Sequence, residues 1–144
     1  MSLYETDPEF MERFDHFALD EVVNEPGQEL EDTTRYLAIL AALTGCQGVD
    51  TFKEVLPKAL DAGLSPVMVK EIVYQAVDYL GMGRVLPFLR AVNEILTDRG
   101  VKLPLPGQAT TTMENRLEKG VDAQAEIFGE QMREAWKGGH INRW

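Results

Sequence analysis

The sequence predicts an all-α protein built as a helical bundle, and three observations support this fold class. Apolar residues recur at helical spacing along most of the chain, with helix-capping residues before such stretches and glycines after them. No run of alternating apolar and polar residues is long enough to predict a strand. The 144 residues, 44% of them hydrophobic, suffice for one domain with a core.

The first predicted helix begins with Asp7 as its cap and Pro8 at its first position, where a missing N–H costs nothing. Its apolar stripe is aromatic and includes Phe10, Phe14 and Phe17. The turn sequence Asn-Glu-Pro-Gly at residues 24–27 ends it.

A second helix is predicted from about Glu29 to Thr44. After Arg35 this stretch is apolar nearly all round, so we expect it at the centre of the fold. Asp50 is the predicted cap of a third helix that stops at Gly63. Pro57 falls inside this third helix and predicts a kink or a late start.

The clearest helix signals lie between Gly63 and Arg84. Ser65 is a good cap, Pro66 suits the first helical position, and Gly81 and Gly83 are predicted to end the helix. One face is continuously apolar, which predicts that it is buried. This face carries Val69, Ile72, Val73, Ala76, Val77 and Leu80.

The opposite face of the same helix carries Glu71, Gln75 and Tyr79, four residues apart and therefore about one turn from each other.

A further helix is predicted over residues 84–99. Residues 101–108 are predicted to form an extended linker, because prolines disfavour helix in the residues before them. A last helix is predicted from about residue 113 to 137. Gly120 and Gly129 each weaken it by about 1 kcal/mol relative to alanine, so two shorter helices are the alternative.

The pattern Gly-x-Ser-Pro-x-x-x-Lys-Glu-Ile-Val-x-Gln-x-x-x-Tyr-x-Gly at residues 63–81 resembles the signature helix of the carboxymuconolactone decarboxylase family, whose fold includes the alkylhydroperoxidase D-like proteins. The resemblance extends to residues 34–43, 59–63 and 85–96, and covers roughly residues 10–100. It implies a helical bundle of the alkylhydroperoxidase D-like type. It also implies a homo-oligomer, a dimer, trimer or hexamer, assembled through the signature helices.

The same resemblance locates the family's reactive residues. The peroxidase branch uses two cysteines, a histidine and a glutamate, which fall here on Gly48, Thr51, Val55 and Tyr36, so none of the four is present. The decarboxylase branch usually carries a histidine at the place of Val55. Valine can neither accept nor donate a proton.

Three other residues have side chains that are often reactive: Cys46, His16 and His140. Cys46 is the single cysteine and has no partner thiol, so we expect an incidental residue. His16 and His140 lie in flanking segments, where surface positions are the simpler interpretation. The scattered carboxylates and distant histidines lack metal-ligand spacing, so no metal and no cofactor is predicted.

Two domains are predicted. Residues 1–103 form the carboxymuconolactone decarboxylase-like module with its N-terminal helix, and residues 104–144 form a linker and a C-terminal helical arm. Residues 116–120 and 126–130 resemble the helix that leads into such a module. The arm is therefore either the opening of a second module or a segment that packs on the first module or a neighbouring subunit.

Composition excludes several partners. With 14 basic and 24 acidic residues the net charge is −10, which argues against nucleic acid and anionic membranes. The single cysteine favours a reducing compartment. No secretory signal and no apolar run of about 20 residues is apparent, so a cytoplasmic protein is expected.

Two interpretations of the polar residues remain open. Arg35 is the predicted anchor for a substrate carboxylate, with Gln75 as a second binding residue and with Glu71 and Tyr79 as proton acceptor and donor. Alternatively, Arg35 pairs with Glu71 or Glu31, and the row Glu71–Gln75–Tyr79 forms hydrogen bonds in the core or across a subunit interface.

Three functions follow from these interpretations. The first is a carboxymuconolactone decarboxylase-like enzyme acting on a small carboxylic acid or lactone. The second is a non-catalytic, oligomer-building half of a double-module protein. An alkylhydroperoxidase or peroxiredoxin-type antioxidant activity is third, because the cysteines it needs are missing.

Overall fold

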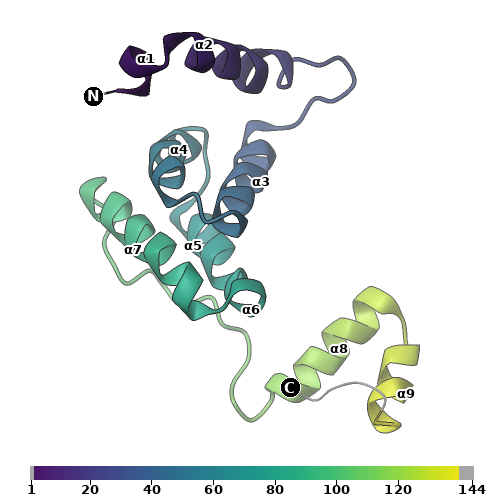
Figure 1. The fold of residues 1–144 in the computed structure, drawn as a ribbon. Coiled ribbons are helices and arrows are strands. Elements are labelled where there is room, and N and C mark those ends of the chain that lie inside the picture. Colours follow the sequence, from purple (N-terminus) through teal and green to yellow (C-terminus); the bar gives the residue numbers. More distant parts are fainter. Residues whose placement is uncertain (1, 140–144) are drawn as a thin grey trace. The chain divides into compact units, whose positions relative to one another are not determined.

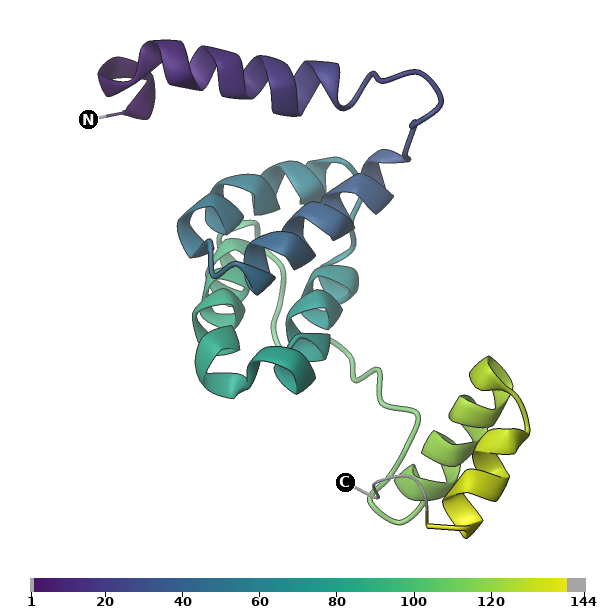
Figure 2. The same ribbon diagram turned by 45° about the vertical axis from the view of Figure 1, so that its right-hand side comes forward.

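The computed structural model describes residues 2–139, and every regular element in this range is helical, which confirms the predicted all-α class (Figures 1 and 2). The chain divides into two compact units, Met1–Leu105 and Pro106–Trp144. The helices of the first unit are α1 (Leu3–Thr6), α2 (Pro8–His16), the π-helical turn η1 (Phe17–Glu21), α3 (Asp32–Gly45), α4 (Val49–Asp61), α5 (Pro66–Gln75), α6 (Val77–Leu80) and α7 (Met82–Asp98). The second unit contains α8 (Arg116–Phe128) and α9 (Gln131–Lys137).

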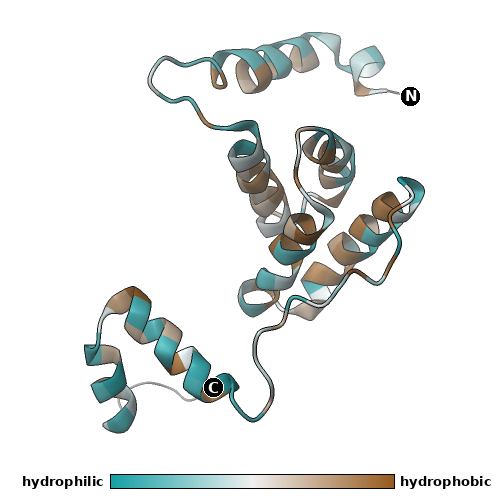
Figure 3. Ribbon diagram, turned by 180° about the vertical axis from the view of Figure 1, so that it is seen from behind, coloured by the Kyte–Doolittle hydropathy of each residue, from teal (hydrophilic) through white to brown (hydrophobic). Residues whose placement is uncertain are grey.

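The hydrophobic core of the first unit lies among α3, α4, α5 and α7. In Figure 3 the brown, hydrophobic turns are concentrated on these helices of the first unit. Phe52 of α4 and Phe88 of α7 meet edge to face at its centre, with ring centroids 5.2 Å apart. The other fully buried members are Leu40, Leu56, Ala59, Val69, Val73, Val85, Val92 and Leu96.

Local capping chemistry places the ends of α5 as predicted. The Ser65 hydroxyl accepts a hydrogen bond from the Met68 N–H at 3.2 Å, and Pro66 is the first helical residue. Gly81 ends α6 with a φ of 79°, a backbone conformation that favours glycine. Gly83 does not end a helix, since it lies in the first turn of α7.

The predicted continuous helix from residue 66 to 80 is interrupted at Ala76, which separates α5 from α6. Val69 and Val73 are fully buried, whereas Ile72 is half-buried at the edge of the core. The predicted apolar face is therefore only partly a core face.

The helix α4 departs from the prediction at its N-terminus. It begins at Val49 with Gly48 at the cap position, so Asp50 is not the cap. It continues through Pro57 to Asp61, and the predicted late start is wrong. Lys53 of α4 pairs with Glu94 of α7 at 3.3 Å. The same two helices also meet through the rings of Phe52 and Phe88.

The N-terminal arm, defined here as α1, α2 and η1, contains no buried residue. The short helix α1 was not predicted, and it is closed by a capping box between Ser2 and Glu5. Phe10 and Phe14 stack with their centroids 6.3 Å apart and remain 66% and 50% exposed. The aromatic stripe of this arm is therefore largely a surface feature.

The second unit is a helix pair. Gly129, with a φ of 102°, ends α8, and Gly120 lies inside that helix, so the alternative of two shorter helices is correct. Trp136 of α9 donates its indole N–H to Gln124 of α8 at 2.6 Å. His140 lies outside the described residues.

Candidate functional site

Two apolar grooves flank α3 on opposite sides of the helix. Arg35, Tyr36, Ile39 and Leu43 line the first, and Leu37, Ala41 and Gly45 line the second. Leu40 and Thr44 lie between these two faces and point into the core. One helix therefore supplies a wall to each groove.

The first groove, called the arm groove here, has a volume of about 850 Å³ and lies between the N-terminal arm and helices α3 and α4. Its walls are mainly aliphatic and aromatic. Apolar side chains come from the arm and the residue after it (Phe14, Phe17, Leu19, Val22) and from the bundle (Ile39, Leu43, Val55). Its charged lining residues are Glu21, Glu25, Arg35 and Lys58.

Arg35 is held at the start of α3, where its side chain is 22% exposed. Its Nη1 group donates to the Asp32 carboxylate at 2.7 Å, and its Nη2 group donates to the Leu30 carbonyl at 2.9 Å. The predicted partners, Glu71 and Glu31, are therefore wrong. Asp32 is the partner because it lies one turn earlier on the same helix, where side chains three residues apart meet.

Three of the positions that the resemblance assigns to reactive residues meet in the arm groove. Tyr36 of α3 and Thr51 and Val55 of α4 all line it. Gly48 does not line it. These three positions therefore share one groove, and they carry hydroxyl and aliphatic groups where the resemblance implies carboxylate, thiol and imidazole.

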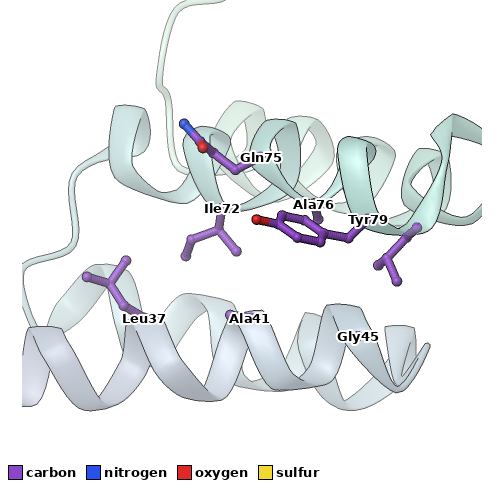
Figure 4. Close-up of a pocket in the computed structure, with 8 residues that line it drawn as sticks. Leu37, Ala41, Gly45, Ile72, Gln75, Ala76 and Tyr79 are labelled. Carbon is purple, nitrogen blue, oxygen red and sulfur yellow. The ribbon is translucent and has the colours of Figure 1, made fainter. Parts of the chain in front are cut away.

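The second groove, called the signature groove here, has a volume of about 450 Å³ and separates α3 from α5 and α6 (Figure 4). Leu37 and Ile72 point toward each other across it, and small residues line both walls, Ala41 and Gly45 from α3 and Ala76 from the facing side. No charged residue lines it.

Tyr79 lies along the signature groove and is 89% exposed, so its ring is largely free in this chain. Gln75 also lines the groove, and its side-chain amide donates to the Glu71 carboxylate at 3.2 Å. This hydrogen bond lies at an exposed position on α5, so the predicted bonding of the row in the core is not observed. Gln75 lines the groove on the far side of α3 from Arg35.

The predicted site residues are therefore divided between two places. Arg35 lines the arm groove, whereas Gln75 and Tyr79 line the signature groove and Glu71 is tied to Gln75. The structure does not bring Arg35 together with Glu71 and Tyr79.

Cys46 and His16 lie at exposed positions. Cys46 follows α3, and its thiol donates to the Leu43 carbonyl at 3.6 Å. His16 pairs with Asp20 of the arm at 3.2 Å. Within residues 2–139, no group of three or more His, Cys, Asp or Glu side chains is placed to hold a metal ion. In the same range, no helix is both long enough and apolar enough to cross a membrane.

The sequence does not predict that the N-terminal arm contributes to a groove. The signal for it is an amphipathic helix with an aromatic stripe that the turn at residues 24–27 separates from the bundle. Such a helix needs a surface for its apolar side, and Phe14 and Phe17 line the groove instead of entering the core.

Comparison with known protein families matches residues 8–94 to the carboxymuconolactone decarboxylase family. Searches of curated proteins and of solved structures gave no match. The matched residues include α2, all of α3 to α6 and most of α7, and therefore both grooves. On this evidence the chain belongs to the carboxymuconolactone decarboxylase family.

Proposed function

We propose that this family member binds a carboxylic acid or lactone in the arm groove, with Arg35 as the anchor for the carboxylate. Arg35 carries the proposal because it lines an apolar groove that also contains three of the positions to which the resemblance assigns reactive residues. Only two of its N–H groups have recorded partners among residues 2–139. A planar guanidinium binds a carboxylate through paired hydrogen bonds, so its remaining N–H groups suit this ligand.

The arm groove contains few side chains that could transfer a proton to or from a bound ligand. Decarboxylation or lactone opening requires proton transfer by a positioned side chain. Val55 cannot supply this, and the hydroxyls of Tyr36 and Thr51 are the groups that replace the family's glutamate and second cysteine. The carboxylates that line the groove are Glu21 and Glu25 of the arm side. Binding is therefore the step that the geometry supports best.

Calorimetry with benzoate and hexanoate tests this proposal. Both acids should bind the wild-type chain and raise its melting temperature, because a ligand that binds only the native state stabilises it. The Arg35→Met variant should lose this response. Arg90→Met is the matched control, since Arg90 is an exposed arginine of α7 that lines neither groove. Equal binding by wild type and Arg35→Met would contradict the proposal.

A second candidate function is assembly of an oligomer without catalysis, and the signature groove favours it. Tyr79 lines this groove and is 89% exposed, and the small residues Ala41, Gly45 and Ala76 also line it. Two copies of a chain with net charge −10 repel each other, so an uncharged apolar face is the suitable place for contact. In this role the chain would be the oligomer-building half of a double-module protein.

Light scattering on the full chain tests this candidate. The wild type should have the mass of an oligomer, and Ala41→Glu should reduce this mass by placing a carboxylate in the groove. Ala38→Glu is the control, since Ala38 is an exposed residue of the same helix that lines neither groove. A monomeric wild type at micromolar concentrations would exclude assembly.

Peroxidase activity has the weakest support. The chain has one cysteine, and Cys46 lies outside the arm groove. Turnover of an organic hydroperoxide should be no faster than that of a free thiol. Faster turnover that is lost in Cys46→Ser would restore this activity.

A further inference from the structure

We infer that the ligand of the arm groove is an apolar monocarboxylate with an extended acyl tail, and that the N-terminal arm forms the wall that selects the length of this tail. This inference rests on the proposed function, since it takes Arg35 as the carboxylate anchor. It adds the chemical class of the ligand and a role for the arm.

The size of the groove argues against a very small acid. Its volume of about 850 Å³ lies in the upper part of the range for sites that hold drug-sized ligands. An acid of a few carbon atoms would leave most of this space filled with water against apolar walls. A longer hydrocarbon tail would displace that water, which is favourable in proportion to the apolar area removed.

The apolar residues of the arm are positioned to contact such a tail. Phe17 and Leu19 line the groove but remain 57% and 60% exposed, so their side chains retain apolar area that a ligand can cover. Across the groove, Leu43 and Val55 are half-buried against the core and form a packed wall. The tail would therefore lie between an exposed wall from the arm and a packed wall from the bundle.

Charge favours one carboxylate over two. Arg35 and Lys58 supply positive charge from the bundle, whereas Glu21 and Glu25 supply negative charge from the arm side. A single carboxylate can pair with Arg35 and leave an uncharged tail for the rest of the groove. These lining charges cancel, so one bound carboxylate already makes the groove net negative, and the second carboxylate of a dicarboxylate would be repelled.

Isothermal titration of the full chain with butanoate, hexanoate, octanoate and decanoate, below the concentrations at which these acids aggregate, tests the ligand class. Affinity should increase about two- to fourfold for each added methylene until the groove is filled. Octanol should bind at least about tenfold more weakly than octanoate, because it lacks the charge that pairs with Arg35. Octanedioate should also bind more weakly than octanoate.

Variants of the arm test its role as the selecting wall. Phe17→Ala should flatten the dependence on chain length while hexanoate binding stays dependent on Arg35. Phe10→Ala is the matched control, because Phe10 is an exposed phenylalanine of the same arm that does not line the groove. Ala18→Trp should fill part of the groove and shift the best ligand to a shorter acid. Far-ultraviolet circular dichroism should show the same helix content in all three variants.

The outcomes separate this inference from the proposed function. Equal affinity for all four acids, still dependent on Arg35, would overturn the acyl tail and leave the carboxylate site intact. Tighter binding of octanedioate than octanoate would likewise overturn the monocarboxylate. An unchanged length dependence in both Phe17→Ala and Ala18→Trp would remove the role of the arm. No binding of any acid would overturn the proposed function as well.

Discussion

The two sides of α3 present similar apolar surfaces but differ in charge. On the arm side, Ile39 and Leu43 share a groove with Arg35, and further charged residues come from the arm side and α4. On the other side, Leu37, Ala41 and Gly45 face α5 and α6 across a groove that no charged residue lines. Both faces come from the single stretch Asp32–Gly45.

This difference assigns the two grooves to different kinds of partner. A charged group in an apolar groove fixes the orientation of a small ligand. An uncharged apolar groove with an exposed tyrosine is typical of a surface that contacts another protein. The functional interpretation of the sequence predicts one site that contains Arg35, Glu71, Gln75 and Tyr79. The division by α3 replaces it with a proposed ligand site and a proposed contact site.

The largest expected effect concerns the core residue between the two grooves. Leu40→Ala should lower the free energy of unfolding by about 2–5 kcal/mol, because Leu40 is fully buried and its loss leaves a cavity. Ile72→Ala should cost only about 1 kcal/mol, because Ile72 is half-buried at the signature groove. Urea titrations of both variants give the comparison. Equal losses would mean that the signature groove is closed and forms part of the core.

The second prediction separates the grooves by function. Arg35→Met should weaken hexanoate binding by about tenfold or more, which corresponds to about 1.4 kcal/mol, and leave the mass in light scattering unchanged. Ala41→Glu should have the reverse effect. If either variant altered both properties, the grooves would be coupled through α3, and the comparison between them would fail.

A smaller effect is expected for the acid that holds Arg35. Asp32 is 67% exposed, so Asp32→Asn should cost only about 0.2–1 kcal/mol of stability, as for other exposed ion pairs. The same change frees the guanidinium from a competing carboxylate and should strengthen hexanoate binding. Melting curves and calorimetry measure the two effects. Weaker binding in Asp32→Asn would show that Asp32 is needed to orient Arg35 rather than competing with the ligand.

Local chemistry explains why most of the fold was predictable. Ser65, Pro66 and Gly81 act through contacts within a few residues, and these contacts have the same geometry in any fold. The break at Ala76 was not predictable, because the sequence there continues the apolar spacing without a proline or glycine. Its position became apparent only in the folded chain.

The sequence predicts a set of site residues, and the structure divides that set between two grooves. The alternative that Arg35 pairs with an acid agrees with the structure, although the acid is Asp32. Glu71 and Gln75 share α5, whereas Tyr79 lies on α6 beyond the break at Ala76. Which side of α3 each group faces depends on how three helices pack, and one-dimensional spacing does not contain that information. The exposure of Phe17 on the arm depends on the same packing.

The smallest expected effect concerns Glu29, which lies in the connection between the N-terminal arm and α3. This connection belongs to the arm-groove side of α3, and the signature-groove side has no counterpart to it. Hydrogen bonds from its own backbone N–H and from the Gly27 N–H, the latter at 3.1 Å, hold the pKa of the Glu29 carboxyl below its ordinary value. Because the folded-state pKa is lowered, the ionised carboxylate stabilises the native chain above its unfolded-state pKa. This contribution is lost as the pH falls through the lowered folded-state pKa.

Carbon-detected NMR titration of the Glu29 carboxyl should give a midpoint below the ordinary glutamate value. Glu29→Gln should weaken the acid dependence of unfolding more than Glu12→Gln, which removes a charge from α2. An unshifted midpoint would mean that the Gly27 contact does not persist in solution, and that the connection leaves the arm free to move away from its groove.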